Sequence, residues 1–283
     1  LDGSSAASDV YKRQAVKRHG AKLMLMNGRL SEKSYRGYGK LPRLIRPMMA
    51  RFDALAVQTQ VEAERYMALG AWPERVYPIG SVKFDMTLDT AVKQAASQLR
   101  VSFGDRPVWI AASTHPGEDA PVLAAHKTLR EQKPDALLIL VPRHPERFDG
   151  VADQVREAGL SVARRSQQEP AAHAAVYLAD TMGELLMLFG ACDVAFVGGS
   201  LVPVGGHNLL EPAAWEKPVL TGPHLHNFTA IAQLLDDAGG LSVVDSGEAL
   251  ADKLQVLMSD PDQCARQGQA AAAVVEANRG ALE

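Results

Sequence analysis

The residues best suited to chemistry stand in four polar segments, each of which directly follows an apolar run. The richest segment, 198–212, reads GGSLVPVGGHNLLEP and leads into a helical pattern. Glycines such as Gly199, here beside Ser200, let a backbone approach a ligand closely, and free N–H groups at a helix start favour a phosphate. Asn208 is expected near the cap, and Glu211 can accept hydrogen bonds from two vicinal hydroxyls, as on a ribose. An ordinary glycine-rich turn is the alternative, and the polar residues at fixed offsets favour a ligand site.

The second segment reads PRHPER and follows the unbroken apolar run 136–141. Arg143 offers a planar fork that suits a phosphate or a pyrimidine edge, and His144 can add a hydrogen-bond donor. A solvated loop is the alternative interpretation. We apply that interpretation to Arg147, which we expect to pair with Glu146, whereas Arg143 is expected to contact a ligand.

The other two segments also stand between a strand and a helix. STHPGE contains Ser113 and His115, which are candidates for a crevice loop, and an ordinary N-cap with Glu118 in the first turn is the alternative. DTMGEL contains Met182 and Gly183. A glycine in the first turn of a helix costs about 1 kcal/mol relative to alanine, so a close ligand would explain its presence.

The elements that position these segments follow a β–α rhythm. Apolar runs at 108–112, 136–141, 160–163, 176–179, 194–197 and 218–221 predict strands. Helical patterns at 120–131, 151–158, 182–191, 207–215, 228–238, 247–258 and 261–277 separate or follow them. Repeated β–α units predict a doubly wound sheet, which binds ligands at the carboxyl ends of its strands. All four polar segments are therefore expected to converge on one crevice.

A shorter rhythm of the same kind comes earlier in the chain. Runs at 21–26, 54–58 and 75–80 predict strands, and patterns at 42–51 and 61–69 predict helices. We therefore expect a partial Rossmann-like domain at 15–85, an interdomain connection at 86–105 and a complete Rossmann-like domain at 106–283. The segment 1–14 has no clear period and is interpreted as a non-native scar.

Basic residues alternate with aromatic and aliphatic residues after the first predicted strand. Those with a possible binding role are Arg29, Ser31, Arg36, Arg43 and Arg46. Such a mixture suits a membrane surface that bears phosphates. An amphipathic helix that covers the protein's own core and turns a basic face to solvent is an equal alternative.

The composition limits the class of protein. The chain has 283 residues, is 47% hydrophobic and 22% charged, and carries a net charge of −3, which fits a packed globular protein and gives no global attraction to nucleic acid. Cys192 and Cys264 lie far apart and lack metal-site spacing, so a reducing compartment is the simpler interpretation. No stretch approaches the roughly 20 apolar residues that span a bilayer.

Six motifs, taken in order, resemble those of the Kdo (3-deoxy-D-manno-octulosonic acid) transferases of lipopolysaccharide assembly. They are NGRLS at 27–31, RFD at 51–53, GSVKFD at 80–85, STHPGE at 113–118, PRHPER at 142–147 and the glycine-rich segment 198–212. The resemblance implies an α/β fold of the GT-B type, with two Rossmann-like doubly wound domains of which the first is incomplete. It also implies CMP-Kdo as donor and a lipid A precursor (lipid IVA) as acceptor.

The resemblance further implies a reaction that inverts the anomeric centre, without a metal ion or cofactor, at the cytoplasmic face of the bacterial inner membrane. The nucleotide contacts carry over to Arg143, His144, Met182, Gly183, Asn208 and Glu211. Ser113, His115, Gly199 and Ser200 complete the expected donor crevice. The acceptor or membrane side is expected to hold Arg29, Ser31, Arg36, Arg43 and Arg46.

Two features depart from the family pattern. The membrane anchor and the catalytic glutamate of the family belong to an N-terminal part that this sequence does not contain, and Gly28 stands where alanine is expected. We therefore expect this chain to bind CMP or the donor weakly and not to transfer Kdo. Two rivals remain: another GT-B enzyme that uses a UDP-sugar, either a transferase or a 2-epimerase, and a non-catalytic membrane-associated binding module.

Overall fold

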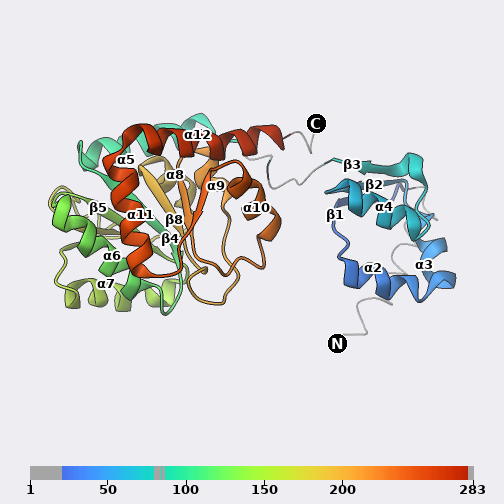
Figure 1. Cartoon of the computed structure of the whole chain (residues 1–283), viewed down its shortest axis with the longest axis horizontal. Coiled ribbons are helices and arrows are strands. Elements are labelled where there is room, and N and C mark those ends of the chain that lie inside the picture. Colours follow the sequence, from blue (N-terminus) through green and yellow to red (C-terminus); the bar gives the residue numbers. More distant parts are fainter. Residues whose placement is uncertain (1–20, 80–83, 85–86, 280–283) are drawn as a thin grey trace. The chain divides into compact units, whose positions relative to one another are not determined.

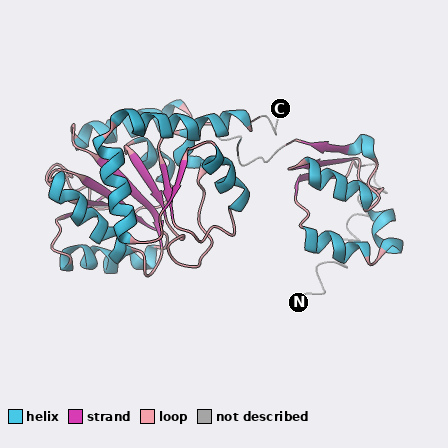
Figure 2. Ribbon diagram, in the orientation of Figure 1, coloured by secondary structure: helices cyan, strands magenta, loops and turns pink. Residues whose placement is uncertain are grey.

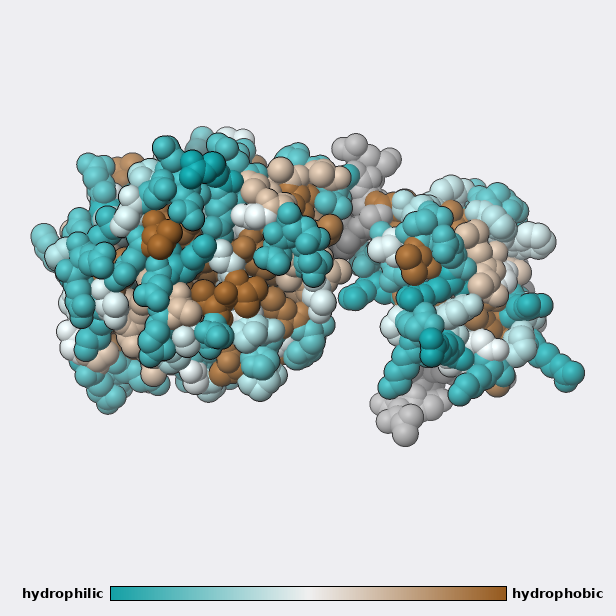
Figure 3. Space-filling model, viewed as in Figure 1, coloured by the Kyte–Doolittle hydropathy of each residue, from teal (hydrophilic) through white to brown (hydrophobic). Residues whose placement is uncertain are grey.

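The computed structural model describes residues 21–79, 84 and 87–279. The chain divides into two compact units, residues 1–85 with 278–283 and residues 86–277 (Figure 1). The predicted non-native segment 1–14 lies outside the described residues. No helix in the described part of the chain is both long and apolar enough to cross a bilayer. On the face that Figure 3 shows, hydrophilic residues cover most of each unit, and hydrophobic patches lie between them.

The first unit is built on a parallel sheet of three strands in the order β1-β2-β3. Its elements are β1 (Met24–Gly28), α2 (Glu32–Gly39), α3 (Pro42–Met49), β2 (Ala54–Val57), α4 (Gln60–Ala68), the 3-10 turn η1 (Pro73–Arg75) and β3 (Val76–Pro78). The three predicted strands of this unit are confirmed, although β1 lies two to three residues later than its predicted range. Helix α2 was not predicted, because it buries no side chain and so has no apolar face to detect.

Helix α3 covers the sheet of its own unit. Ile45 and Met49, one turn apart, are buried against Leu55 and Val57 of β2. That spacing places both apolar side chains on one face of the helix. The structure thus shows the amphipathic helix on the protein's own core, with its basic face left exposed.

The second unit is built on a parallel sheet of seven strands in the order β10-β9-β8-β4-β5-β7-β6. The strands are β4 (Val108–Thr114), β5 (Leu137–Pro142), β6 (Val162–Arg164), β7 (Val176–Leu178), β8 (Val194–Val197), β9 (Val219–Thr221) and β10 (Leu241–Val243). Six of them were predicted. Edge strand β10 was missed because it has three residues, of which Val243 is half exposed, so it forms no apolar run.

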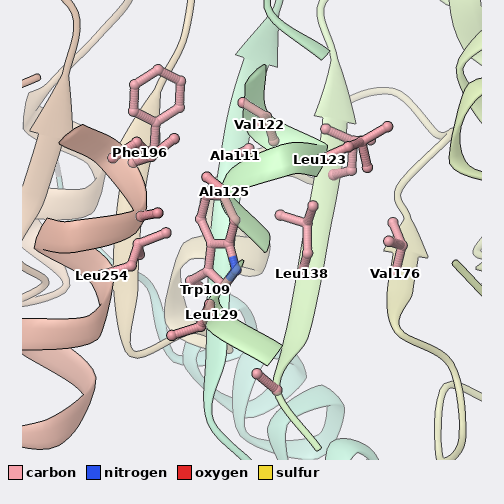
Figure 4. Packing of buried hydrophobic residues seen from close by; sticks show 14 of the residues in the cluster. Trp109, Ala111, Val122, Leu123, Ala125, Leu129, Leu138, Val176, Phe196 and Leu254 are labelled. Atoms are coloured by element: carbon pink, nitrogen blue, oxygen red, sulfur yellow. The ribbon is translucent and has the colours of Figure 1, made fainter. Parts of the chain in front are cut away.

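Helices cover both faces of this sheet, as Figure 2 shows. The helices are α5 (Thr90–Phe103), α6 (Asp119–Gln132), α7 (Phe148–Glu157), α8 (Leu185–Gly190), α9 (Leu210–Ala214), α10 (Thr229–Asp237), α11 (Gly247–Ser259) and α12 (Pro261–Ala277), with the 3-10 turn η3 (Pro145–Arg147). Trp109 and Ala111 of β4 pack with α6, α7 and α11, whereas Ile110 packs with α5 and α8. Figure 4 shows the first of these cores, with Trp109 beside Leu138 of β5. This burial on both faces explains the continuous apolar runs.

Helix α5 lies in the stretch that was interpreted as an interdomain connection. Ala96 and Phe103 on this helix are buried in the second unit's core. The Phe103 ring meets Tyr177 edge to face, with ring centroids 5.2 Å apart. These contacts tie residues 90–103 to the second unit.

The strand order creates a topological switch point between β4 and β8. From β4 the chain builds β5, β6 and β7 on one side, and then it builds β8, β9 and β10 on the other. Connections that diverge from two neighbouring strands leave a crevice at their carboxyl ends. The loops after β8, β4, β5 and β7 therefore lie in a row along one edge of the sheet.

One buried histidine of this core is held neutral. Trp109 donates from Nε1 to His126 Nδ1 over 3.0 Å, and His126 Nε2 lies 2.9 Å from the Ala175 carbonyl oxygen. Because the indole N–H can only donate, the proton of the imidazole sits on Nε2 and is donated to Ala175. Burial lowers the pKa of His126 to about 3.

Candidate functional site

A buried carboxylate joins the loops on either side of the switch point. Glu118 is fully buried, and its Oε2 accepts from the backbone N–H groups of His115 (2.9 Å) and Gly199 (2.7 Å). Its Oε1 accepts from the N–H groups of Ser200 (3.0 Å) and Leu201 (2.9 Å). The glycine-rich loop thus directs three of its N–H groups at a protein carboxylate. These three N–H groups are therefore not free for a phosphate, whereas the phosphate contact expected at the start of the following helix stays a prediction.

Ser200 also holds this loop in place. The residue is fully buried, and its Oγ donates to the Val197 carbonyl oxygen over 2.7 Å and accepts from the Gly222 N–H over 2.8 Å. A hydroxyl and an amide that are both occupied are not available to a ligand. The predicted contact of Ser200 with the nucleotide is therefore corrected to a role in fixing the loop.

Gly199 forms the floor beneath two histidines. Its φ is +65°, and a Cβ atom here would lie 2.8 Å from Cδ2 of His207. Glycine is required both by the left-handed backbone and by the neighbouring ring. Gly199 is therefore predicted to act through the position of His207, since its own N–H is bound to Glu118.

Three histidines from three loops form one cluster above Gly199. The Nε2 atoms of His115 and His207 lie 2.8 Å apart, in rings inclined by 11°. The ring of His144 meets His115 edge on, with centroids 5.3 Å apart and an interplanar angle of 85°. Burial lowers the pKa of His207 to about 4 and also lowers the pKa of His115. No group of three or more His, Cys, Asp or Glu residues in the described ranges is arranged to hold a metal ion.

The two arginines of the PRHPER loop have different roles. Arg147 binds the carboxylate of Asp119 and the carbonyl oxygen of Thr114, so its predicted pairing with Glu146 is wrong. The loop itself is anchored by the Arg143 N–H, which donates to the same carbonyl over 3.0 Å. The Arg143 side chain is exposed and makes no hydrogen bond or ion pair with any residue that the structure describes. Its guanidinium fork is therefore open.

The loop after β7 is longer than predicted, because the helix expected from residue 182 begins only at Leu185. Gly183 has a φ of +83° and precedes α8, so it lies outside the helix in which it was predicted. A Cβ atom at Gly183 would meet nothing within 4 Å, and Met182 beside it is 61% exposed. Asp180 caps no helix, because its carboxylate binds Arg164 at 2.6 Å. The carboxylate of Glu184 accepts from Nε and Nη2 of Arg165, at 2.5 and 2.6 Å.

Asn208 and Glu211 form a connected pair at the start of α9. This helix begins at Leu210, three residues later than predicted. Asn208 Oδ1 accepts from the Leu210 N–H over 3.1 Å, and its Nδ2 donates to Glu211 Oε1 over 3.0 Å. Burial raises the pKa of Glu211. Its second carboxylate oxygen accepts no hydrogen bond from the described residues and can serve a ligand.

Ser113 stands at the end of β4 in a left-handed conformation, with a φ of +58°. The residue is buried and precedes His115 by two positions. Its left-handed backbone coincides with a shift in the pairing register between β4 and β5, directly before the loop that carries His115. Its direct contact with a nucleotide stays a prediction.

The basic residues of the first unit are distributed around α2 and α3. Ser31 is the N-cap of α2 and accepts from the Ser34 N–H over 3.2 Å, and Arg36 pairs with Glu32 at 2.8 Å. Three further arginines are exposed, namely Arg29, Arg43 and Arg46. Between them lie three exposed apolar side chains, Tyr38 (45%), Leu41 (57%) and Leu44 (59%). Their role in binding an acceptor or a membrane stays a prediction.

Two cavities of the second unit lie away from Arg143 and Glu211. One, of about 470 Å³, lies against α10 and β10 and is lined by His224 and Thr229 among others. The other, of about 600 Å³, reaches Glu184 at the end of the loop after β7. The polar chemistry is concentrated in the row of loops, and we assign the candidate site there.

Comparisons with known proteins agree with this geometry. The profile of a family described as 3-deoxy-D-manno-octulosonic-acid transferase (kdotransferase) matches residues 13–86. A 3-deoxy-D-manno-octulosonic acid transferase of Haemophilus influenzae is 40% identical over 263 residues, which is 92% of this chain and 62% of that protein. The transferase of the same name from Bordetella pertussis is 38% identical over 94% of this chain and 63% of its own length. This chain therefore spans somewhat less than two thirds of these relatives.

Solved structures extend the likeness to three dimensions. The C-terminal CMP-Kdo binding domain of WaaA from Acinetobacter baumannii aligns over its whole length with 66% of this chain, at 33% identity and a TM-score of 0.64. Anabaena Alr3699/HepE, in complex with UDP and glucose, aligns with 96% of this chain and 72% of its own, at 16% identity and a TM-score of 0.52. The latter likeness shows the fold alone, which is the α/β fold of GT-B glycosyltransferases. The chain belongs to the 3-deoxy-D-manno-octulosonic acid (Kdo) transferase family.

Proposed function

We propose that the second unit binds CMP-Kdo as the donor in a reaction that moves Kdo to a lipid A precursor, with inversion at the anomeric carbon. The supporting observation is the row of loops at one edge of the sheet. In this row Arg143 has an open guanidinium, Glu211 has a free carboxylate oxygen, and Gly183 leaves open space beside its backbone. The relative named as a CMP-Kdo binding domain covers 66% of this chain, which is close to the length of the second unit, residues 86–277.

Each open group suits one part of a cytidine nucleotide. The guanidinium of Arg143 supplies a cation and paired donors for the phosphate. The free carboxylate oxygen of Glu211 accepts from the ribose hydroxyls, and Asn208 fixes the other oxygen at 3.0 Å. The open backbone at Gly183 lets the base approach without meeting a side chain. Met182, which is exposed beside it, can cover an apolar face of the ligand.

The chemistry of transfer follows from where charge develops. As a carboxylate takes the proton of the acceptor hydroxyl, the hydroxyl oxygen forms a bond to the anomeric carbon of Kdo. The bond between that carbon and the phosphate oxygen breaks, and CMP leaves as an anion. Fixed donors near the phosphate stabilise that charge more strongly than they stabilise the intact donor. Under this proposal, Arg143 and the histidine cluster supply such donors. The general base is not assigned to any described residue.

The first unit suits the acceptor and the membrane. Exposed Leu41 and Leu44 stand beside exposed Arg43 and Lys40 on α3 and its N-terminal flank. An apolar and basic surface of this kind binds anionic lipid headgroups, because apolar side chains enter the interface while cations meet the phosphates. We place this surface at the cytoplasmic face of the bacterial inner membrane.

Calorimetric titration of the chain with CMP, UMP and UDP tests the donor assignment. We expect CMP to bind more tightly than UMP. We expect Arg143→Ala to lower the affinity for CMP by about tenfold or more, because a charge-assisted contact is lost. Glu146→Gln, a change to an exposed neighbour on the same loop, is the control and should leave affinity unchanged. Tighter binding of UDP than of CMP, or equal affinity in Arg143→Ala, would contradict the proposal.

A further inference from the structure

Two histidines from opposite sides of the switch point share one proton. His115 belongs to the loop after β4 and His207 to the loop after β8, and their Nε2 atoms lie 2.8 Å apart. Two nitrogens at this distance form a hydrogen bond only if one carries a hydrogen and the other does not. Neither Nδ1 atom has a hydrogen-bond partner among the described residues.

The tautomers of the pair decide what it shows to a ligand. In the neutral pair, the ring that donates from Nε2 has a bare Nδ1, and the ring that accepts carries its hydrogen on Nδ1. The pair then presents one donor and one lone pair. Adding a proton fills the bare Nδ1, so that the pair presents two N–H donors and a positive charge. An anion therefore favours the protonated pair, whereas a neutral ligand does not.

The surroundings keep the free pair neutral. Burial is the main cause that lowers the pKa of both rings, to about 4 for His207. Arg143 and His144 repel a further positive charge on both rings, and Arg147 repels one on His115. The carboxylate of Glu118 acts in the opposite direction and raises the pKa of both rings, because its negative charge favours their protonated form. The free pair thus lacks the second donor at neutral pH, and an incoming anion can change that.

We propose that the His115–His207 pair takes up one proton when the anionic part of a cytidine nucleotide binds, and that the positive charge of the pair and an N–H donated from it then stabilise that anion. The proposal rests on the proposed function, since it takes the donor's phosphate or sugar carboxylate as the ligand. Gly199 supports the geometry, because any larger residue beneath His207 would displace the ring. The two histidines are positioned across the crevice where the strand order reverses.

Proton uptake makes affinity depend on pH. The anion-bound pair has a higher pKa than the free pair, so binding is coupled to uptake at every pH between the two values. Within that window the affinity for the anion falls as the pH rises, by at most tenfold per pH unit for one proton. Cytidine, which lacks the anion, should show no such dependence.

Calorimetry in buffers of different ionisation enthalpy measures the number of protons directly. At pH 7 we expect the wild-type chain to take up protons with CMP and none with cytidine. His207→Gln retains a hydrogen-bonding group but cannot be protonated, so it should bind CMP with less uptake and a flatter pH profile. His173→Gln, at an exposed histidine outside the four loops, is the matched control. The phosphate of CMP, with a pKa of about 6, contributes the same number of exchanged protons in all three proteins, so it cancels in the comparison.

The ring nitrogens of the wild-type protein give a second readout that needs no variant. In ¹⁵N spectra, the signals of His115 and His207 should move from the neutral pattern to the imidazolium pattern when CMP is added. Binding of CMP with equal proton uptake in wild type and His207→Gln, or with unchanged ring signals, would overturn the inference alone. Failure of CMP to bind the folded wild-type chain would instead overturn the proposed function, and the inference with it.

Discussion

The most demanding prediction concerns the carboxylate that joins the two loops at the switch point. Glu118→Gln changes one atom of a fully buried side chain and preserves its shape. In the wild type, each carboxylate oxygen accepts from two backbone N–H groups, which makes four in all. The glutamine oxygen can keep two of these bonds. Its NH₂ group cannot accept, and it would face the other two N–H groups as a donor against donors.

The size of the loss follows from that count. A buried donor left without an acceptor costs about 1–3 kcal/mol, so two such donors predict a loss of about 2–6 kcal/mol in the free energy of unfolding. A domain's whole stability is about 5–15 kcal/mol, so the variant should be strongly destabilised or partly unfolded. Because the glycine-rich loop would also shift, CMP affinity should fall together with stability.

Urea unfolding followed by tryptophan fluorescence measures this loss, since Trp109 lies in the core of the second unit. Glu146→Gln makes the same chemical change at an exposed site in the same unit and should stay within about 0.5 kcal/mol of wild type. If Glu118→Gln matched that control, Glu118 would not hold the two loops as the structure shows, and the account of the switch point would be wrong.

Three further predictions test other parts of the structure. His126→Gln should make the free energy of unfolding less sensitive to acid, as measured in urea at pH 7 and 4.5. The pKa of His126 is about 3 in the folded state and about 6.5 in the unfolded state. The stability that neutral His126 contributes is therefore complete above pH 6.5 and falls by about 1.4 kcal/mol per pH unit below it. Gly222→Ala should lower the melting temperature clearly, because its Cβ would lie 2.3 Å from the backbone of Ser200, whereas Gly150→Ala in α7 meets nothing and should leave it equal or raised. Leu44→Asp should weaken sedimentation with anionic vesicles and preserve stability, since this side chain is 59% exposed; unchanged vesicle binding would argue against a membrane role for α3.

The sequence predicted the parts of the fold that depend on local pattern. Continuous apolar runs such as 136–141 identify buried parallel strands, and the polar segment after each run identifies a loop at the carboxyl edge. Helix α2 and strand β10 escaped because neither has an apolar face or run of useful length. Gly183 was misplaced because α8 begins only at Leu185, while the neighbouring Asp180 and Thr181, which could cap an earlier helix start, bind Arg164 and Glu184 instead.

Interactions between distant residues could not be predicted from one sequence. Glu118 was recognised only as an acidic residue near a helix start, whereas its partners Gly199, Ser200 and Leu201 lie 81, 82 and 83 positions away. The pairing of His115 with His207, separated by 92 positions, is equally invisible to local pattern. Both become apparent only when the sheet order brings the ends of β4 and β8 together.

A crystal structure of the chain soaked with CMP tests the central claim most directly. We expect one nucleotide at the carboxyl edge of the seven-stranded sheet, with its phosphate at Arg143, its ribose at Glu211 and its base over Gly183. Density for CMP in the cavity lined by His224 and Thr229, or contact with only one of those three residues, would contradict it.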